Sequence, residues 1–195
     1  MRLVSPWRAA ELLREGGVGL VPTETVVGLV ADIRGLPRLF EIKERDPDKP
    51  IAVLCPSVES ALLRFREVPS LAWTLAERFW PGPLTLVLDA GSGETIGLRV
   101  ADHRAVQEIL ACRGPMYATS ANLSGRPAPT ALKHVDPRVA SAVDFAVPGT
   151  PGTGEASAVV SLSGGRVELL RPGAGLTQDK LLRLADAQAH PPSLI

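Results

Sequence analysis

Four segments of the chain concentrate hydroxyl, amide, basic and glycine residues where a packed core would not need them. The first is Pro22 to Thr25 (PTET), directly after an apolar run. Polar side chains that follow a buried strand of an α/β sheet commonly face a ligand crevice. Thr and Glu at this spacing also fit the N-cap of a helix, so this segment alone leaves both interpretations open.

The second segment is Lys43 to Pro50 (KERDPDKP), which proline forces out of a helix. It brings three cations close together: Lys43, Arg45 and Lys49. Arginine offers a planar fork to phosphate oxygens and lysine a mobile point charge, so the three can surround a polyphosphate. The alternative is a solvated helix end, where basic residues complement the helix dipole.

The third and fourth segments are rich in glycine and hydrogen-bond donors. Ser120 to Thr130 (SANLSGRPAPT) can cradle phosphates through backbone N–H and hydroxyl groups, although an Asx-rich turn has a similar composition. Gly152 to Ser157, together with Leu170 to Gly173, can close over a nucleotide or simply flank a hairpin. The sequence contains no GxxxxGK[ST] phosphate loop, no HExxH motif and no paired-carboxylate pattern.

Composition narrows the class of protein. The 195 residues include 21 basic and 21 acidic ones, so binding to nucleic acid would have to come from a local patch. Cys55 and Cys112 lack a CxxC or histidine-pair context, which argues against a disulfide scaffold or a zinc site. No apolar run has the length of a signal peptide or a bilayer span, so we expect a cytoplasmic protein without membrane association.

Apolar runs and capping residues predict helices and short strands around the four segments. Ser5 and Pro6 begin a helix that Gly16 ends, and Asp102 and Thr177 are expected to cap later helices. The other predicted helices are 36–43, 58–65, 71–79, 103–110 and 136–143, and the predicted strands are 18–21, 51–54, 84–88, 96–100, 116–119, 158–162 and 167–170. This mixture indicates one α/β domain over 1–187 around a twisted, partly parallel sheet, followed by a loose tail at 188–195.

Taken in order, the four segments and their neighbours resemble the YrdC-like family. The matching stretches are VPTETVVGL (21–29), IKERDPDKPI (42–51), FWPGPLTLVL (79–88), GLRVADH (97–103), TSANLSGRPAPT (119–130) and ASAVVSLSGGRVELLRPGAG (156–175). Each motif is weak alone, but their combination and order are specific, and they cover nearly the whole chain. The resemblance implies an α/β fold with a twisted mixed sheet of parallel and antiparallel strands, flanking helices and a basic cleft.

The resemblance also implies a reaction, in which L-threonine, bicarbonate and ATP give threonylcarbamoyl-AMP and pyrophosphate for threonylcarbamoyladenosine modification of tRNA. The amine of the amino acid becomes a carbamate, whose oxygen attacks the α-phosphorus in line. The protein therefore has chiefly to position the reactants and offset charge. ATP is a substrate, Mg²⁺ can accompany it, and the sequence shows no carboxylate cluster that would form a metal site.

Family placement assigns roles residue by residue. Lys43 and Arg45 are the expected catalytic residues. The expected amino-acid-binding residues are Thr25, Arg99 and Ser157, and Arg99 suits the substrate carboxylate. The expected ATP-binding residues are Arg45, Lys49, Thr95, Ser120, Asn122, Thr130 and Arg171.

The chain departs from the family pattern at Val27, Val30, Lys49, Leu54 and Ala158, where an aromatic residue, glycine, asparagine, histidine and threonine are usual. Because losing polar partners reduces discrimination, nucleotide binding is expected to persist while the acceptor stays open. One alternative is a non-catalytic protein that binds double-stranded RNA or tRNA, or matures ribosomes, through the same cleft. Another is a paralogue that acts on a different acceptor. Resemblance to short, single-domain members also implies partner proteins in tRNA modification.

Overall fold

The computed structural model describes residues 1–46, 49–150, 152–173 and 175–189. The strands are β1 (Arg2–Leu3), β2 (Val18–Pro22), β3 (Val27–Ala31), β4 (Ala52–Leu54), β5 (Leu84–Gly91), β6 (Glu94–Arg99), β7 (Met116–Ser120), β8 (Phe145–Ala146), β9 (Ala158–Ser161) and β10 (Glu168–Arg171). The α-helices are α1 (Pro6–Arg14), α2 (Leu36–Lys43), α3 (Val58–Leu62), α4 (Ser70–Phe79), α5 (Arg104–Arg113), α6 (Pro137–Ala142) and α7 (Gln178–Ala189). Two 3-10 helices, η1 (Leu132–His134) and η2 (Ser163–Gly165), complete the set of described elements.

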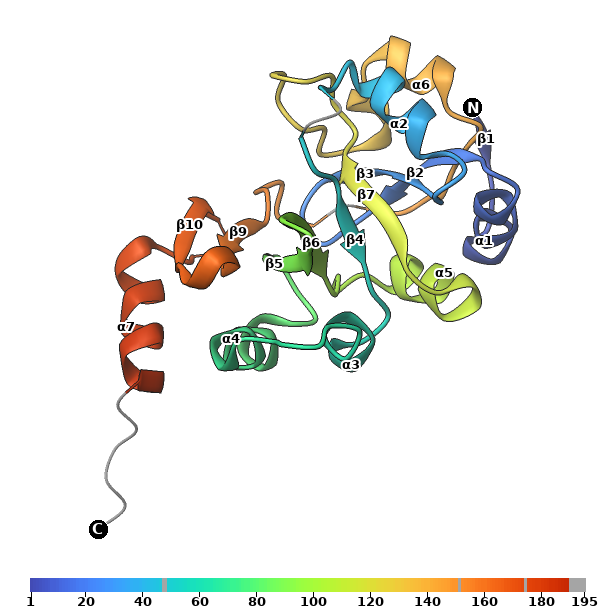
Figure 1. Ribbon diagram of the computed structural model, residues 1–195. Helices are drawn as coiled ribbons and strands as arrows, with labels where there is room; N and C mark the ends of the chain where they lie inside the picture. Colours follow the sequence, from blue (N-terminus) through green and yellow to red (C-terminus); the bar gives the residue numbers. More distant parts are fainter. Residues whose placement is uncertain (47–48, 151, 174, 190–195) are drawn as a thin grey trace.

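All ten strands belong to one sheet, in the order β1-β8-β2-β3-β7-β4-β6-β5-β9-β10 (Figure 1). Four neighbouring pairs run parallel: β1–β8, β2–β8, β4–β6 and β5–β9. The other five pairs run antiparallel. The predicted α/β fold with a mixed sheet is therefore confirmed. That this sheet extends from β1 to β10 supports the single domain expected over 1–187, which stays a prediction.

Helices cover both faces of one half of the sheet but pack on one face of the other half. Helices α1 and α5 pack on one side of β2, β3 and β7, and α2 and α6 pack on the other side. In the second half, α3, α4 and α7 bury one face of β5, β6 and β9 (Figure 1). Because side chains alternate along a strand, the residues between those of this core face the opposite side, where they line a cavity.

Capping chemistry confirms several predicted helices. The hydroxyl of Ser5 accepts a hydrogen bond from the backbone N–H of Arg8 at 3.3 Å, at the start of α1. Ser57 and Ser60 form a reciprocal capping box at α3, and the hydroxyl of Thr177 accepts from the N–H of Lys180 at 3.4 Å. The helix predicted over 36–43 has the bounds of α2.

Other expectations were wrong. Strand β3 was not predicted, because all five of its residues are buried and the run lacks the alternation that marks a half-buried strand. Since a strand follows Pro22 to Thr25, the helix N-cap interpretation of that segment is also wrong. His103, not Asp102, occupies the N-cap position of α5, and it makes no side-chain capping bond.

The C-terminal helix runs further than expected. Helix α7 includes Gln188 and Ala189, which were assigned to a loose tail, and the rest of that tail, 190–195, lies outside the described residues. The hydroxyl of Thr74 on α4 donates to Oε1 of Gln188 at 2.5 Å, which anchors the end of α7. No helix in the described part of the chain combines the length and apolar character that crossing a bilayer requires.

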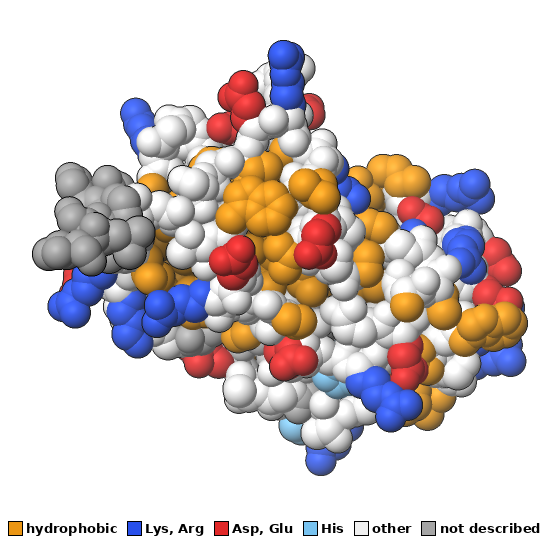
Figure 2. Space-filling model, turned by 90° about the horizontal axis from the view of Figure 1, so that it is seen from below, with side chains coloured by type: hydrophobic (Ala, Val, Ile, Leu, Met, Phe, Trp, Pro, Cys, Tyr) orange, Lys and Arg blue, Asp and Glu red, His pale blue; other side chains and the backbone are white. Residues whose placement is uncertain are grey.

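The surface over α3 and α4 mixes charges of both signs. Figure 2, seen from below Figure 1, shows an apolar patch with Lys, Arg, Asp and Glu side chains interspersed around it. Because neither sign dominates among the residues drawn in colour, this face does not present the single-sign field that draws in nucleic acid. A polyanion would have to be recognised on another face.

Candidate active site

A cavity of about 790 Å³ lies over the face of the sheet opposite α3 and α4. Its floor includes residues at alternate strand positions, most of them small: Ala52, Thr85, Val87, Gly97, Ala118, Val159 and Ser161. At Gly97 a Cβ atom would lie 3.3 Å from Cβ of Ala52 and 3.4 Å from Cγ2 of Thr85, so even alanine would crowd the floor. Because these side chains are small, they leave the space above the sheet unfilled, and the volume of the cavity is typical of sites for nucleotide-sized ligands.

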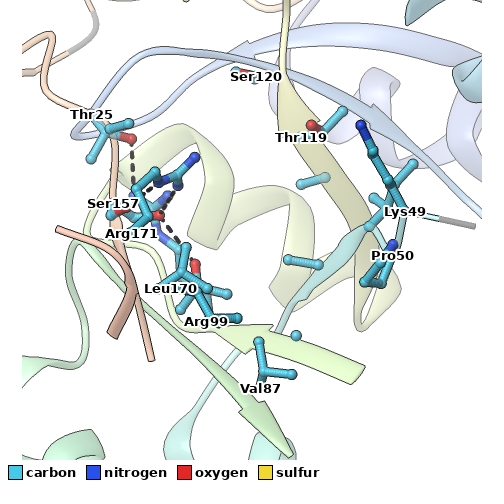
Figure 3. A pocket seen from close by; sticks show the side chains of 18 of the residues that line it. Thr25, Lys49, Pro50, Val87, Arg99, Thr119, Ser120, Ser157, Leu170 and Arg171 are labelled. Atoms are coloured by element: carbon cyan, nitrogen blue, oxygen red, sulfur yellow. Dashed lines mark hydrogen bonds between the residues drawn. The ribbon is translucent and has the colours of Figure 1, made fainter. Parts of the chain in front are cut away.

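Cations outnumber carboxylates in the lining. The cationic lining residues are Lys43, Arg45, Lys49, Arg99 and Arg171, whereas Glu168 is the carboxylate among the described lining residues. The polar residues lie on two sides, with Lys49 on one side and Thr25, Arg99, Ser157 and Arg171 on the other (Figure 3). This lining supports the predicted basic cleft, although its potential stays a prediction.

Lys43, the last residue of α2, is almost fully buried at one side of the cavity. Its Nζ donates to the carbonyl oxygens of Ser120 at 2.7 Å and Asn122 at 2.9 Å, and it lies 3.4 and 3.3 Å from their side-chain oxygens. Burial lowers the pKa of Lys43 to about 8, and the positive charge of Arg45 adds to this shift. The ammonium therefore fixes the start of the 120–130 segment and titrates near physiological pH.

The neighbouring loops are held in place by their own hydrogen bonds. Arg45 donates from Nε to the carbonyl of Lys49 at 3.2 Å and from Nη2 to that of Pro50 at 3.0 Å. The Nδ2 group of Asn122 donates to the carbonyls of Leu123 at 2.9 Å and Arg126 at 2.6 Å. The third segment is thus an Asn-stabilised turn that also lines the cavity, so the two interpretations of it are compatible.

Arg99, at the end of β6, is the centre of the second side. Its Nη2 donates to Oε1 of Glu24 at 2.6 Å and to the hydroxyl of Thr25 at 3.1 Å, and its Nε donates to the carbonyl of Gly82 at 3.2 Å. Only 10% of the Arg99 side chain and 15% of the Glu24 side chain are exposed, so this ion pair is largely desolvated. Three partners from two loops therefore fix the plane of the guanidinium.

Arg171, at the end of β10, lies beside Arg99. It donates from Nε to the carbonyl of Ser157 at 2.9 Å and from Nη2 to the Ser157 hydroxyl at 3.1 Å. That hydroxyl also lies 3.1 Å from the hydroxyl of Thr85 on the cavity floor. Burial and the positive charge of Arg99 lower the pKa of Arg171. Two guanidinium groups thus converge at this side, where they suit an anionic group such as a carboxylate.

The glycine-rich fourth segment binds the first one through backbone hydrogen bonds. The N–H groups of residues 152, 153 and 154 donate to the carbonyls of residues 23, 24 and 25 at 3.0, 3.0 and 2.8 Å. At Gly152 a Cβ atom would lie 1.8 Å from the carbonyl oxygen of Glu24, so only glycine allows this approach. The contact joins the loop that carries Ser157 to the loop that supports Arg99.

Most of the predicted site residues line the cavity. They are Thr25, Lys43, Arg45, Lys49, Thr95, Arg99, Ser120, Asn122, Ser157 and Arg171. Thr130 is not among the lining residues: it is exposed, and its hydroxyl lies 3.2 Å from Nδ1 of His134. Arg171, predicted to bind ATP, lies with the predicted amino-acid-binding residues. Glu24 and Thr85 were missed, although alternation from Leu84 placed Thr85 opposite the core.

Two of the five departures from the family pattern face the cavity, namely Lys49 and Leu54. Val27, Val30 and Ala158 are buried in the hydrophobic cores and do not line it. Those three substitutions therefore change packing and leave the lining unaltered. Over the described ranges the structure contains no group of three His, Cys, Asp or Glu residues that could hold a metal ion.

Half of the mixed sheet leaves one face open, and the cavity over that face has cationic residues on two sides. A cavity lined in this way suits a ligand with more than one anionic group. A sequence model of the Sua5_yciO_yrdC family, described as "Telomere recombination", matches residues 11–173. The chain belongs to this Sua5/YciO/YrdC family, the family that its motifs resemble.

Two relatives and one solved structure illustrate the match. The threonylcarbamoyl-AMP synthase of Pyrococcus abyssi is 35% identical over 96% of this chain and 60% of the relative, and that of Bacillus subtilis is 38% identical over 89% and 54%. The crystal structure of P. abyssi Sua5 complexed with L-threonine superposes with a TM-score of 0.84 and 33% identity, over 94% of this chain and 60% of that one. The chain thus spans less than two thirds of the length of these relatives.

Proposed function

We propose that this protein makes threonylcarbamoyl-AMP from L-threonine, bicarbonate and ATP, and releases pyrophosphate, for threonylcarbamoyladenosine modification of tRNA. The observation that carries this proposal is a cavity with two cationic sides, which can hold a polyphosphate and an amino-acid carboxylate over one floor. The names of the relatives and the L-threonine bound to P. abyssi Sua5 support the choice of reaction and acceptor.

The reaction asks the protein to align two substrates. The amine of threonine attacks the carbon of bicarbonate, and the hydroxyl group of bicarbonate leaves as water with a proton from the nitrogen, which gives a carbamate. A carbamate oxygen then attacks the α-phosphorus of ATP, and the bond to pyrophosphate breaks. Because charge moves onto the pyrophosphate, cations near the β- and γ-phosphates lower the barrier. Holding the two substrates in line over one floor lowers the barrier further, because the reacting atoms no longer have to meet by diffusion.

The two sides divide these tasks. Lys43, Arg45 and Lys49, with the donors of Ser120 and Asn122, are proposed to face the phosphates, and Thr95 is proposed to contact the nucleotide. Arg99 with Thr25, and Ser157 with Arg171, are proposed to hold the amino acid. Thr130 faces His134 and would need to turn to reach ATP. Magnesium would enter bound to the phosphates, since the described residues offer no cluster to hold it.

The direct test is pyrophosphate release from ATP and bicarbonate, with and without L-threonine, followed by other amino acids. We expect threonine-dependent release that Lys43→Ala and Arg45→Ala reduce by at least about tenfold, as loss of a charge-assisted contact to phosphate implies. Release with another amino acid alone would indicate a paralogue with another acceptor. A folded protein without any release, but with salt-dependent RNA binding, would indicate the non-catalytic alternative.

The cellular setting is proposed on the same basis. A threonylcarbamoyl-AMP product needs a second activity that transfers its acyl group to tRNA, so we propose tRNA and other tRNA-modification proteins as partners. A cytoplasmic location, where tRNA and ATP are available, stays a prediction. Co-purification of the tagged full chain with tRNA-modification proteins would support this setting.

A further inference from the structure

Glu24 is a carboxylate without an assigned role, placed directly behind the arginine proposed to bind the amino acid. It contributes Oε1 to Nη2 of Arg99 at 2.6 Å, and it does not line the cavity. Its second oxygen, Oε2, is buried and has no hydrogen-bond partner within the described residues. Because Arg99 and Glu24 form an ion pair, the carboxylate offsets much of the positive charge that Arg99 would otherwise present to a ligand.

Arg99 keeps donors for a ligand despite this pairing. The bonds recorded for it use Nε and Nη2, so its Nη1 group is left with two N–H donors in the described structure. An anion that binds there, beside Arg171, also approaches the carboxylate of Glu24. A bare anion is attracted by two guanidinium groups and repelled by the carboxylate of Glu24. A zwitterion can in addition turn its ammonium group toward that carboxylate, which attracts it.

We propose that Glu24 is a specificity-determining residue that makes the Arg99 side of the cavity select a zwitterionic amino acid over a simple carboxylate. This inference rests on the proposed function and deepens it, because it explains how an amino acid is kept apart from the many anions of a cell. Glu24 acts through its charge and through Arg99, without contact to the substrate.

The expected size of the effect follows from the charge. A unit charge about 6 Å away, at an effective dielectric constant of about 20, corresponds to roughly 100-fold in binding. Solvent in the open cavity screens part of this interaction. We therefore expect the preference for a zwitterion to change by about 10- to 100-fold when the charge is removed.

The test compares two ligands that differ only in the amine. Calorimetry without ATP would give the dissociation constants of L-threonine and of (R)-3-hydroxybutanoate, which is threonine without its amino group. Wild type should bind threonine at least tenfold more tightly. Glu24→Gln, which keeps an oxygen for Arg99 but removes the charge, should lower this ratio by about 10- to 100-fold, largely because the anion binds better.

Two variants separate charge from structure. Glu24→Asp keeps the charge and should preserve a preference for threonine even where both affinities fall. Glu168→Gln removes a carboxylate that lines the same cavity from the opposite end of β10 to Arg171. It should leave the ratio within about twofold of wild type, well below the effect expected for Glu24. Circular dichroism would establish that each variant is folded at the temperature of the titration.

The outcomes are distinguishable. A ratio that Glu24→Gln leaves within twofold, with threonine still bound, overturns this inference and leaves the proposed function standing. Equal affinity of wild type for both ligands also overturns it. A folded wild type that binds ATP but neither threonine nor any other amino acid overturns the proposed acceptor and this inference together.

Discussion

Replacing Lys43 by methionine tests whether a buried ammonium organises the phosphate-facing side of the cavity. Methionine keeps most of the apolar stem of lysine and removes Nζ, so packing around α2 changes little. What is lost is the pair of hydrogen bonds from Nζ to the carbonyls of Ser120 and Asn122, at 2.7 and 2.9 Å. What is gained is relief from the cost of holding a charge away from water.

The two effects are of similar size. The fall in the pKa of Lys43 from 10.5 to about 8 corresponds to roughly 3 kcal/mol at about 1.36 kcal/mol per pKa unit. Two hydrogen bonds to a charged donor contribute about 1.5–3 kcal/mol each. We therefore expect Lys43→Met to lower the free energy of unfolding at pH 7 by no more than about 3 kcal/mol, while ATP affinity falls at least about tenfold.

The pH dependence of stability gives the sharper result. Between pH 8 and 10.5 the unfolded chain keeps the proton on Lys43 that the folded protein has lost, so unfolding takes up protons and wild-type stability rises with pH relative to the variant. The difference in free energy of unfolding, wild type minus Lys43→Met, should be flat below about pH 7 and rise by up to roughly 3 kcal/mol by pH 10.5.

Urea denaturation of both proteins at a series of pH values measures this difference. Lys49→Met is the matched control, because Lys49 belongs to the same segment but is exposed, so this substitution should change the free energy of unfolding at pH 7 by no more than about 0.5 kcal/mol. A flat curve for Lys43→Met would refute the argument that burial depresses the pKa of Lys43. A difference that falls steadily from pH 8 upward would refute it too.

Two further substitutions test the contacts on the other side. Gly152→Ala forces a Cβ to 1.8 Å from the carbonyl oxygen of Glu24, so we expect a loss of about 2–3 kcal/mol in unfolding free energy and a weaker threonine response. Gly28→Ala, with no neighbour closer than 3.4 Å, should cost at most about 1 kcal/mol by the same urea assay. Arg171→Lys keeps the charge but loses the paired hydrogen bonds from the guanidinium to the carbonyl and hydroxyl of Ser157. The KM for threonine should therefore rise about tenfold, while the KM for ATP should change less than threefold. An equal rise in both KM values would place Arg171 with the phosphate-binding residues.

Local patterns in the sequence determine much of this fold. Helix α2 was predictable because its apolar residues recur at helical spacing and it ends at a charged loop with proline. Strand β8 was not predictable, since its two residues gain strand geometry only by pairing with β1 and β2. Strand β3 is buried on both sides, so its composition could not distinguish a strand from a buried turn of helix.

The site was harder to predict than the elements. The motifs located the loops, but the ion pair of Glu24 and Arg99 joins residues 75 positions apart, and no local spacing reveals it. Thr130 belongs to the 120–130 segment that lines the cavity, yet its hydroxyl forms a hydrogen bond with the ring of His134, four residues further along the chain. Which member of a polar segment faces a ligand depends on the tertiary course of the loop, and that is set by long-range contacts such as those of Gly152.

The open face of the sheet explains why the two charged sides can cooperate. In β5 the leucines at 84, 86 and 88 pack against the helices, so the residues between them, Thr85 and Val87, form the floor instead. That floor is small and largely uncharged, which suits the parts of a ligand that carry no charge. We therefore expect the uncharged middle of the two aligned substrates to lie on it, with phosphates toward Lys43 and the amino acid toward Arg99. A bulky residue at Gly97 would then weaken the binding of both substrates at once. A substitution on the Lys43 side or on the Arg99 side would instead weaken the binding of one substrate.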